Sequence, residues 1–229
     1  MFQDSGTENW QKNWMLDGTR AEVLNTAAGF ELRAGAEHLN DTCHTVLWTQ
    51  KSFTGNIAIS YDYTRTDTTT RCVNILYFHA QGKGTEEYPK DISMWNDKRK
   101  VPHMRTYFNT METYHISYAA FNAKEYSGEN DYIRLRRYNP NDGGLSGTDI
   151  PGDHYNTGLF KPFVTYHIEV YFDNGRIEMR VADTLKANDT IICKWDVSNY
   201  RLYNEGRIGL RHMYTRNARY SDFKVWQLE

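Results

Sequence analysis

Short apolar segments rich in Val, Ile, Tyr and Phe recur along the chain, and Gly, Asn, Asp or Pro residues separate them. Within these segments apolar and polar positions tend to alternate, which is the period of a β-strand with one buried face. No segment has the longer period of an extended amphipathic helix. The clearest predicted strands are 46–49, 56–64, 71–80, 114–120, 132–138, 165–172, 176–182, 191–196, 207–213 and 220–227.

The strongest local signal is a β-hairpin. Asn174 and Gly175 lie between two predicted strands, and this dipeptide supplies the positive φ angles of a type I′ turn. So many antiparallel strands predict two stacked sheets, because one open sheet would leave an apolar face in water. We therefore expect an all-β protein, a two-sheet antiparallel β-sandwich of the jelly-roll type, in a single domain over residues 1–229. The stretches 81–113 and 139–161 are expected to be long loops that wall a groove above one sheet.

One predicted strand, 132–138, carries charge on a single face. Alternation places Ile133 and Leu135 on one side and the following residues on the other: Tyr132, Arg134, Arg136 and Tyr138. Guanidinium groups bind carboxylate or sulfate groups at two points, and aromatic rings stack on sugars. This face is either the floor of an anionic ligand site or a solvated surface on which arginine stems cover tyrosine rings.

Three further residues are candidates for the same groove. His115 lies opposite the apolar side of its strand, and a histidine titrates near neutral pH. Arg211 shares a face with Gly209, which either leaves room for a ligand or marks a bulge. His79 ends a strand where the first long loop begins. The simpler interpretation of each histidine is a surface or hydrogen-bonded residue.

Charge and cysteine content narrow the function classes. The net charge is −2, from 27 basic and 29 acidic residues, so no overall field attracts nucleic acid or an anionic membrane. Apolar runs fall short of the roughly 20 residues that cross a bilayer. Cys43, Cys72 and Cys193 form no paired motif, which indicates neither a disulfide framework nor a zinc site, and we expect no metal or other cofactor.

Several motifs resemble a known family. They lie in the segments 47–57, 74–82, 115–118, 206–211 and 218–223. Together these segments resemble the YesU-type family, long described as a domain of unknown function, and the similarity runs from about residue 10 to residue 227. The resemblance implies a galectin- or concanavalin-like sandwich. His115, Tyr118, Arg134 and Arg211 fall in matching segments, whereas His79 departs from the family pattern.

The resemblance also implies an activity on polysaccharides that contain uronic acids, such as rhamnogalacturonan or ulvan. A related reaction removes water from the terminal uronate of ulvan oligosaccharides and leaves a 4,5-unsaturated sugar. We therefore expect a carbon–oxygen lyase, either an oligosaccharide dehydratase or a polysaccharide lyase, with an acidic oligosaccharide as its partner. Two alternatives stay open: a non-catalytic carbohydrate-binding module and, in third place, a sandwich-fold glycoside hydrolase, for which Glu169 and Glu178 are the candidate carboxylates.

β-Elimination from a uronate needs a cation at the carboxylate, a base for the C5 proton and an acid for the leaving oxygen. We assign His115 to catalysis together with Tyr132 or Tyr118. Alternation favours Tyr132 and the resemblance favours Tyr118, and both face the groove only if a bulge intervenes. The expected substrate-binding residues are Arg134, Arg136, Arg211, His79, Trp48 and Tyr138.

The chain opens with Met1 followed by polar sequence, which is also what remains after a signal peptide is removed. For an enzyme of polysaccharide breakdown we expect a periplasmic or extracellular location, with the cytoplasm as the alternative. The sequence does not define an oligomeric state.

Overall fold

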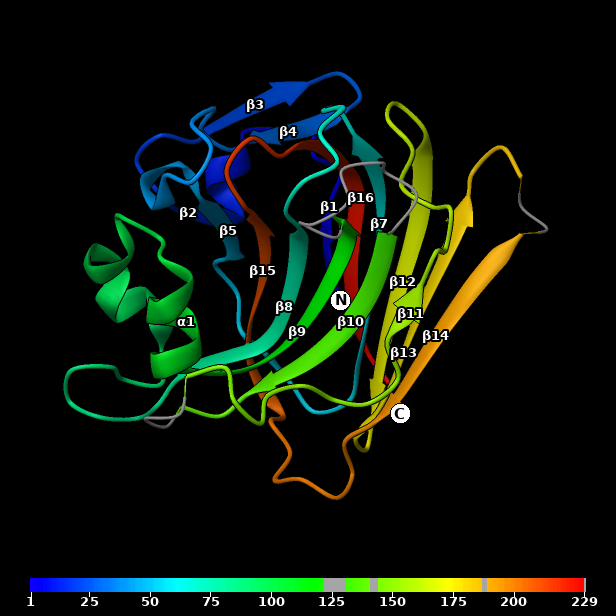
Figure 1. Ribbon diagram of the computed structural model, residues 1–229. Coiled ribbons are helices and arrows are strands. Elements are labelled where there is room, and N and C mark those ends of the chain that lie inside the picture. The colour runs from blue at the N-terminus through cyan, green and yellow to red at the C-terminus, as the bar shows by residue number, and fades with distance from the viewer. Residues whose placement is uncertain (122–130, 141–143, 187–188, 229) are drawn as a thin grey trace.

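The computed structural model describes residues 1–121, 131–140, 144–186 and 189–228. Its strands form two antiparallel sheets of eight strands each, which pack face to face (Figure 1). The structure confirms the predicted fold class, a two-sheet jelly-roll sandwich. The helical turns are short, and none of those described is long and apolar enough to cross a membrane.

The first sheet, called the outer sheet, has the strand order β14-β13-β12-β7-β16-β4-β3, and β1 pairs with β16. Its strands are β1 (Phe2–Asp4), β3 (Glu22–Thr26), β4 (Gly29–Arg33), β7 (Ile57–Arg65), β12 (Thr165–Asp173), β13 (Arg176–Asp183), β14 (Thr190–Asp196) and β16 (Asn217–Gln227). The predicted hairpin joins β12 and β13, with φ angles of 48° at Asn174 and 84° at Gly175.

The second sheet, called the site sheet, has the order β11-β10-β9-β8-β15-β5-β2, and β6 pairs with β15. Its strands are β2 (Trp14–Asp17), β5 (Thr45–Thr49), β6 (Phe53–Thr54), β8 (Asn74–Gly82), β9 (Met111–Phe121), β10 (Asp131–Tyr138), β11 (His154–Tyr155) and β15 (Glu205–His212). The helical elements are η1 (Trp10–Lys12), η2 (Asp41–Cys43), η3 (Ile92–Arg99) and α1 (Met104–Thr110).

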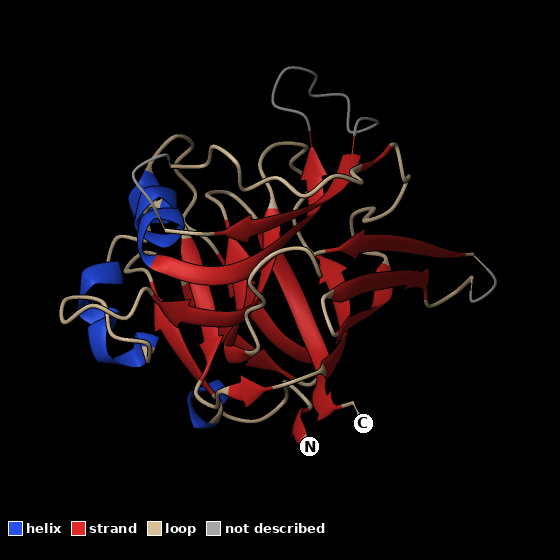
Figure 2. Ribbon diagram, turned by 90° about the horizontal axis from the view of Figure 1, so that it is seen from below, coloured by secondary structure: helices blue, strands red, loops and turns tan. Residues whose placement is uncertain are grey.

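The main core lies between the two sheets, where strand residues of period two interdigitate. A second apolar cluster lies on the opposite face of the site sheet and includes Trp48, Tyr77 and Tyr107. The segment 83–110, called the covering segment, contains η3 and α1 and supplies Tyr107 to this cluster. Figure 2 shows these helical turns gathered at one side of the sandwich.

A buried carboxylate holds the covering segment on the sheet. Asp17, at the end of β2, is 1% exposed, and its Oδ2 accepts hydrogen bonds from Trp48 at 2.7 Å, Arg99 at 2.5 Å and Tyr107 at 2.9 Å. The predicted loop 81–113 is therefore an ordered cover over part of the site sheet, with helical turns of its own. In the second predicted loop, 139–161, the structure adds β11, and residues 141–143 lie outside the described residues.

Candidate functional site

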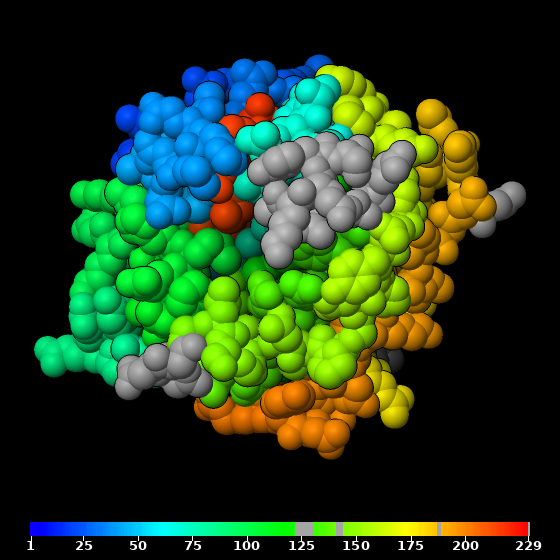
Figure 3. All heavy atoms as spheres, viewed as in Figure 1, coloured from blue at the N-terminus to red at the C-terminus, as the bar shows by residue number. Residues whose placement is uncertain are grey.

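The residues predicted from alternation on β10 do share one face of the site sheet, turned away from the main core. In the register of β9 and β10, Arg136 pairs with His115 and Arg134 pairs with Ser117. We call the face formed by Tyr132, Arg134, Arg136, Tyr138, His115 and Ser117 the site face. Figure 3 shows residues 144–160 (yellow-green) and the covering segment (green, at the left) on the same side of the molecule.

His115 is the centre of the site face. Its Nδ1 lies 2.6 Å from the Tyr138 hydroxyl, and its Nε2 lies 2.7 Å from the Ser117 hydroxyl. Burial lowers the pKa of His115 well below 6.5, and the charges of Arg136, Arg211 and Arg134 lower it further. The imidazole is therefore neutral at neutral pH, with one nitrogen protonated and the other able to accept a proton.

Tyr138 completes this pair. Its side chain is fully buried, and burial raises the pKa of its hydroxyl well above 10. The phenol therefore keeps its proton at neutral pH. A neutral imidazole and a neutral phenol in hydrogen-bond contact can together accept one proton and donate another.

The two β10 arginines form the accessible part of the site face. Arg134 donates to Asp153 and lies 5.1 Å from the ring centre of Tyr132, and Arg136 donates to Asp149 at 2.8 Å. Their side chains are 25% and 20% exposed. Burial acts to raise the pKa of Asp153, but hydrogen bonds from Arg134 and Tyr155 hold it below its usual value. An incoming anion therefore meets two guanidinium groups whose present partners are carboxylates.

Arg211 lies deeper, beneath the covering segment. It is fully buried, and its Nη2 donates to the Pro102 carbonyl at 2.6 Å and lies 3.0 Å from Nδ1 of His44. Among the residues that the structure describes, none accepts a hydrogen bond from the buried Nε and Nη1 of Arg211, and none pairs with the Tyr77 hydroxyl. Within the described ranges no ion pair joins Arg211 to a carboxylate, so its charge adds to the positive potential around His115.

Besides the buried Arg211, three predicted site residues lie in the main core or beneath the covering segment, and the expected contact of all four with substrate is corrected. Tyr118 points into the main core, where its hydroxyl lies 3.1 Å from that of Tyr220. His79 also turns to the core and contacts Phe172 at 5.0 Å between ring centres. The reason is a bulge in β8 between Phe78 and Gln81, with a φ of 50° at His79.

Trp48 is on the expected face of the site sheet, but it is fully buried beneath the covering segment. Its ring stacks with those of Tyr77 and Tyr107, at 5.5 and 6.4 Å between ring centres. A side chain at Gly209 would come within 2.5 Å of the Trp48 ring. The space beside Arg211 that the sequence assigns to a ligand is therefore filled by Trp48.

The structure places five residues on the face that alternation predicts for them: Tyr132, Arg134, Arg136, Tyr138 and His115. It also adds residues that the prediction missed. Ser117 carries a usable signal, since it lies two residues after His115 on the same strand and must share its face. The other additions lie beyond local sequence patterns: Tyr77, Asp149, Asp153 and Tyr155. Over the described ranges, no group of three or more His, Cys, Asp or Glu side chains is placed to hold a metal ion.

Hollows of the surface lie beside the site face and not on it. One of about 1050 Å³ follows the covering segment and is lined by Lys83, His103 and Phe108 among others. None of its lining residues belongs to the site face. The His115–Tyr138 pair is therefore buried beneath the accessible arginines of the site face, whereas the sequence predicts these side chains in a groove.

Residues 5–225 match the model of a family described as a domain of unknown function, DUF1961. A protein of unknown function with a galectin-like fold from Bacillus subtilis superposes with a TM-score of 0.75 and 18% identity, over 99% of this chain and 95% of that chain. A legume lectin-like domain from Entamoeba histolytica superposes with a TM-score of 0.64 and 6% identity, over 96% of this chain and 92% of that chain. The VIP36 exoplasmic/lumenal domain in its Ca²⁺/Man3GlcNAc-bound form superposes with a TM-score of 0.60 and 13% identity, over 96% of this chain and 85% of that chain. No curated protein matches the chain.

Proposed function

The chain belongs to the DUF1961 family, and from its lectin-like sandwich and the chemistry of its site face we propose that it acts on an acidic carbohydrate. The substrate would be an oligosaccharide that contains uronic acids, of the ulvan or rhamnogalacturonan type. The reaction would be a β-elimination that leaves a 4,5-unsaturated uronate at the non-reducing end. The observation that carries this proposal is the neutral His115–Tyr138 pair next to three arginine charges.

Each requirement of the reaction has a side chain on this face. The C5 proton of a uronate is hard to remove because the neighbouring carboxylate is already negative. Arg134 and Arg136 would neutralise that carboxylate and stabilise the enolate-like intermediate, and Arg211 adds its charge from below. Binding there replaces part of their present contact with Asp153 and Asp149.

The contacts of His115 define how protons would move. In the tautomer with the proton on Nδ1, the Tyr138 oxygen accepts that hydrogen bond and its own proton is free. Nε2 then accepts from Ser117, and it becomes the base when that hydroxyl turns away. Nε2 takes the C5 proton, the C4–O bond breaks, and Tyr138 gives its proton to the departing oxygen. Transfer of the Nδ1 proton to the tyrosinate neutralises both groups and leaves the imidazole protonated on Nε2. Release of that proton to water and uptake of a proton at Nδ1 return the starting tautomer.

A second candidate function is binding of the same sugar without chemistry. It is favoured by the burial of the reactive pair, because His115 is 1% exposed and Tyr138 is fully buried. Only the outer part of the site face, with Tyr132, Arg134 and Arg136, meets a ligand without rearrangement. Elimination requires in addition that the substrate reaches Nε2 past the Ser117 hydroxyl.

The glycoside hydrolase alternative has less support. The candidate carboxylates Glu169 and Glu178 lie on β12 and β13 of the outer sheet, on the face that carries Arg180. On the site face, Asp149 and Asp153 are held by Arg136 and Arg134. A retaining or inverting hydrolase needs one carboxyl group whose pKa is raised, and the pKa of Asp153 is lowered instead. For either remaining function we propose a periplasmic or extracellular location, where polysaccharide fragments are met.

The test is to incubate the protein with ulvan- and pectin-derived oligosaccharides and to follow the ultraviolet absorbance of the unsaturated uronate. We expect a rise with the wild-type protein. Tyr138→Phe should lower kcat by about 100-fold or more because the proton donor is lost. The matched variant Tyr118→Phe should keep its rate, since the Tyr118 hydroxyl lies in the main core beside that of Tyr220.

Mass spectrometry separates the two leaving groups: loss of one water identifies a dehydratase, and shortening of the oligosaccharide identifies a lyase.

Removing the buried Tyr138 hydroxyl should lower the free energy of unfolding by about 1 kcal/mol, which a urea titration checks. Binding of the oligosaccharide without any rise in absorbance would contradict the elimination and support the binding function.

A further inference from the structure

A further cavity, with a largely apolar lining, lies at one end of the sandwich, apart from the site face. It has a volume of about 420 Å³ and is lined where β7 ends and where β9 meets the start of β10. Arg65 and Lys161 provide its basic groups, and Phe121, Leu159 and Phe160 form apolar walls. No residue of the site face lines it.

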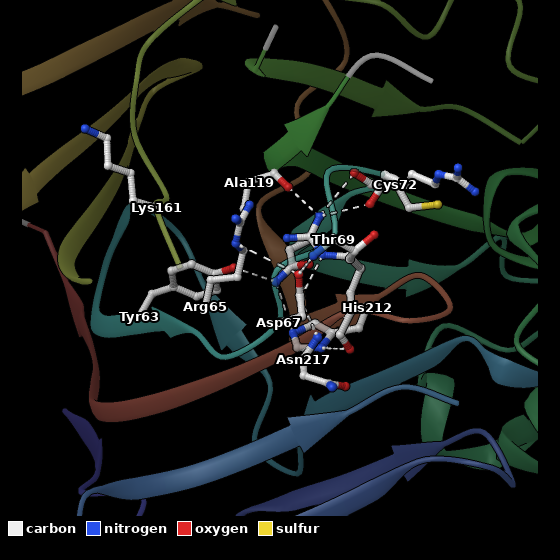
Figure 4. Close-up of polar contacts among 12 residues, drawn as sticks. Tyr63, Arg65, Asp67, Thr69, Cys72, Ala119, Lys161, His212 and Asn217 are labelled. Carbon is white, nitrogen blue, oxygen red and sulfur yellow. Dashed lines mark hydrogen bonds and ion pairs between the residues drawn. The ribbon is translucent and has the colours of Figure 1, made fainter. Parts of the chain in front are cut away.

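Two buried arginines next to this cavity share a single carboxylate. Arg65 and Arg216 are 3% and 0% exposed, and Asp67 is 8% exposed. Nε of Arg216 lies 3.0 Å from Asp67 Oδ2, whereas Nε of Arg65 lies 3.9 Å from Oδ1, which is beyond hydrogen-bond distance (Figure 4). The same carboxylate also accepts hydrogen bonds from the backbone N–H groups of Thr69 and Asn217.

The two arginines differ in how well they are held. Nη1 of Arg216 donates to the carbonyl groups of Arg71, Cys72 and Ala119, which explains its place in the fold. Arg65 has no such role. Its Nε and Nη1 are buried and have no hydrogen-bond partner among the described residues, and its guanidinium lies 4.9 Å from the ring centre of Phe121.

A second carboxylate at the cavity, that of Asp131, has other hydrogen-bond partners than Arg65. Asp131 accepts hydrogen bonds from the backbone N–H groups of Thr157 and Gly158 and from the Thr157 hydroxyl. Within the described ranges, the only carboxylate within 4.0 Å of a basic nitrogen of Arg65 is Asp67. Burial and the charge of Arg216 lower the pKa of Arg65, as is typical of a cation that lacks sufficient counter-charge.

Buried guanidinium donors without acceptors are costly, and an oxyanion both accepts a hydrogen bond and supplies counter-charge. We propose that the cavity at Arg65 is a second binding site, which takes a sulfate or carboxylate group. The oxyanion would accept a hydrogen bond from one of the two unpartnered nitrogens of Arg65, Nε or Nη1. Lys161, at the rim, supplies a further cation, and the apolar walls accommodate the carbon skeleton of a bound acid. The source of the group is either a free inorganic anion or the acidic substituent of a sugar.

The first test measures thermal unfolding with sodium selenate against sodium chloride at equal ionic strength. Selenate also stabilises proteins without a site, and that effect does not saturate. We expect a saturable rise of Tm in the wild-type protein that is lost in Arg65→Gln. The control Arg176→Gln removes an exposed arginine of the β12–β13 hairpin and keeps the saturable rise. A saturable rise that persists in Arg65→Gln would overturn the proposal, as would its absence from the wild type.

The second test does not depend on a variant that folds. Crystals of the wild-type protein soaked in selenate should show an anomalous peak at hydrogen-bond distance from the Arg65 guanidinium. No peak there, or peaks only elsewhere, contradicts the site. Adding glucuronate or a sulfated monosaccharide then identifies the source: displacement of the peak indicates a sugar-borne anion, and persistence of the peak indicates a free one.

Discussion

Four histidines are buried in neutral form at separate places in the fold. Burial lowers the pKa of His44 to about 3, of His212 to about 3 and of His79 to about 4. Burial, followed by the arginine charges, lowers the pKa of His115 well below 6.5. In the unfolded chain each of these histidines takes up a proton near pH 6.5.

The stability of the protein should therefore fall on mild acidification. Between pH 6.5 and about 4 the unfolded chain binds protons at these histidines that the folded chain does not. The free energy of unfolding therefore becomes smaller as the pH decreases. Each such histidine contributes a slope of about 1.4 kcal/mol per pH unit. The free energy of unfolding from urea titrations at pH 7, 6 and 5 measures this slope.

His212→Gln should lower the slope by about 1.4 kcal/mol per pH unit, the contribution of one proton. His167 acts in the opposite direction. Its hydrogen bond to Asp62 raises its pKa, so its contribution is present below pH 6.5 and is lost as the pH rises. Its side chain is 40% exposed, and solvent screening keeps this contribution small. A stability that is constant or increases from pH 6.5 to 5 would contradict this account.

Among the elements, the covering segment depends on one buried ion pair. The side chains of Asp17 and Arg99 are both fully buried, and Nε of Arg99 lies 2.5 Å from Oδ2 of Asp17. Asp17→Asn would leave the Arg99 charge without a counter-charge, which should cost about 3–5 kcal/mol. The comparison is Asp153→Asn, because Asp153 pairs with the partly exposed Arg134 and should cost about 1 kcal/mol or less.

Hydrogen exchange locates the effect. In Asp17→Asn, the backbone amides of η3 and α1 should exchange faster, while those of the β12–β13 hairpin change only by the loss of global stability. Equal effects of the two variants on stability would show that the Asp17 contacts do not hold the covering segment.

The sequence predicts every described strand of seven residues or more, where alternation extends far enough to show, and misses most of the shorter strands. β10 is a clear case, since Ile133 and Leu135 enter the core and the residues between them do not. β3 lies at the edge of the outer sheet with its residues half-buried or exposed, and therefore lacks an apolar stripe. The η3 turns are too short and irregular for a helical period, so the sequence predicts a loop there.

The same limits explain the candidate site. Tyr118 is on the apolar side of its strand, as Tyr114 and Ile116 already indicate, and only the family resemblance favoured it. His79 depends on a bulge that alternation does not show. Trp48 is covered by Tyr107, which lies 59 positions further along the chain (107 − 48), and that contact comes from tertiary packing alone.

At the scale of the whole molecule, folding separates charges that are nearly balanced along the chain. The net charge is −2, yet three arginines surround His115: Arg134, Arg136 and Arg211. At the cavity that Arg65 lines, the two positive charges of Arg65 and Arg216 face the single negative charge of Asp67. Such local excess is what an acidic ligand recognises. The central claim of the account is that the site face binds an acidic carbohydrate.

Calorimetry tests this claim most directly, by titrating a uronate oligosaccharide and a neutral one of equal length into the wild-type protein and two double variants. Arg134→Gln with Arg136→Gln removes charge from the site face, and Arg176→Gln with Arg180→Gln removes the same charge from the outer sheet. The account predicts that the wild type prefers the acidic sugar and that the site-face variant loses at least about tenfold in affinity, while the outer-sheet variant does not. Equal affinity for both sugars, or an unchanged Kd in the site-face variant, would contradict it.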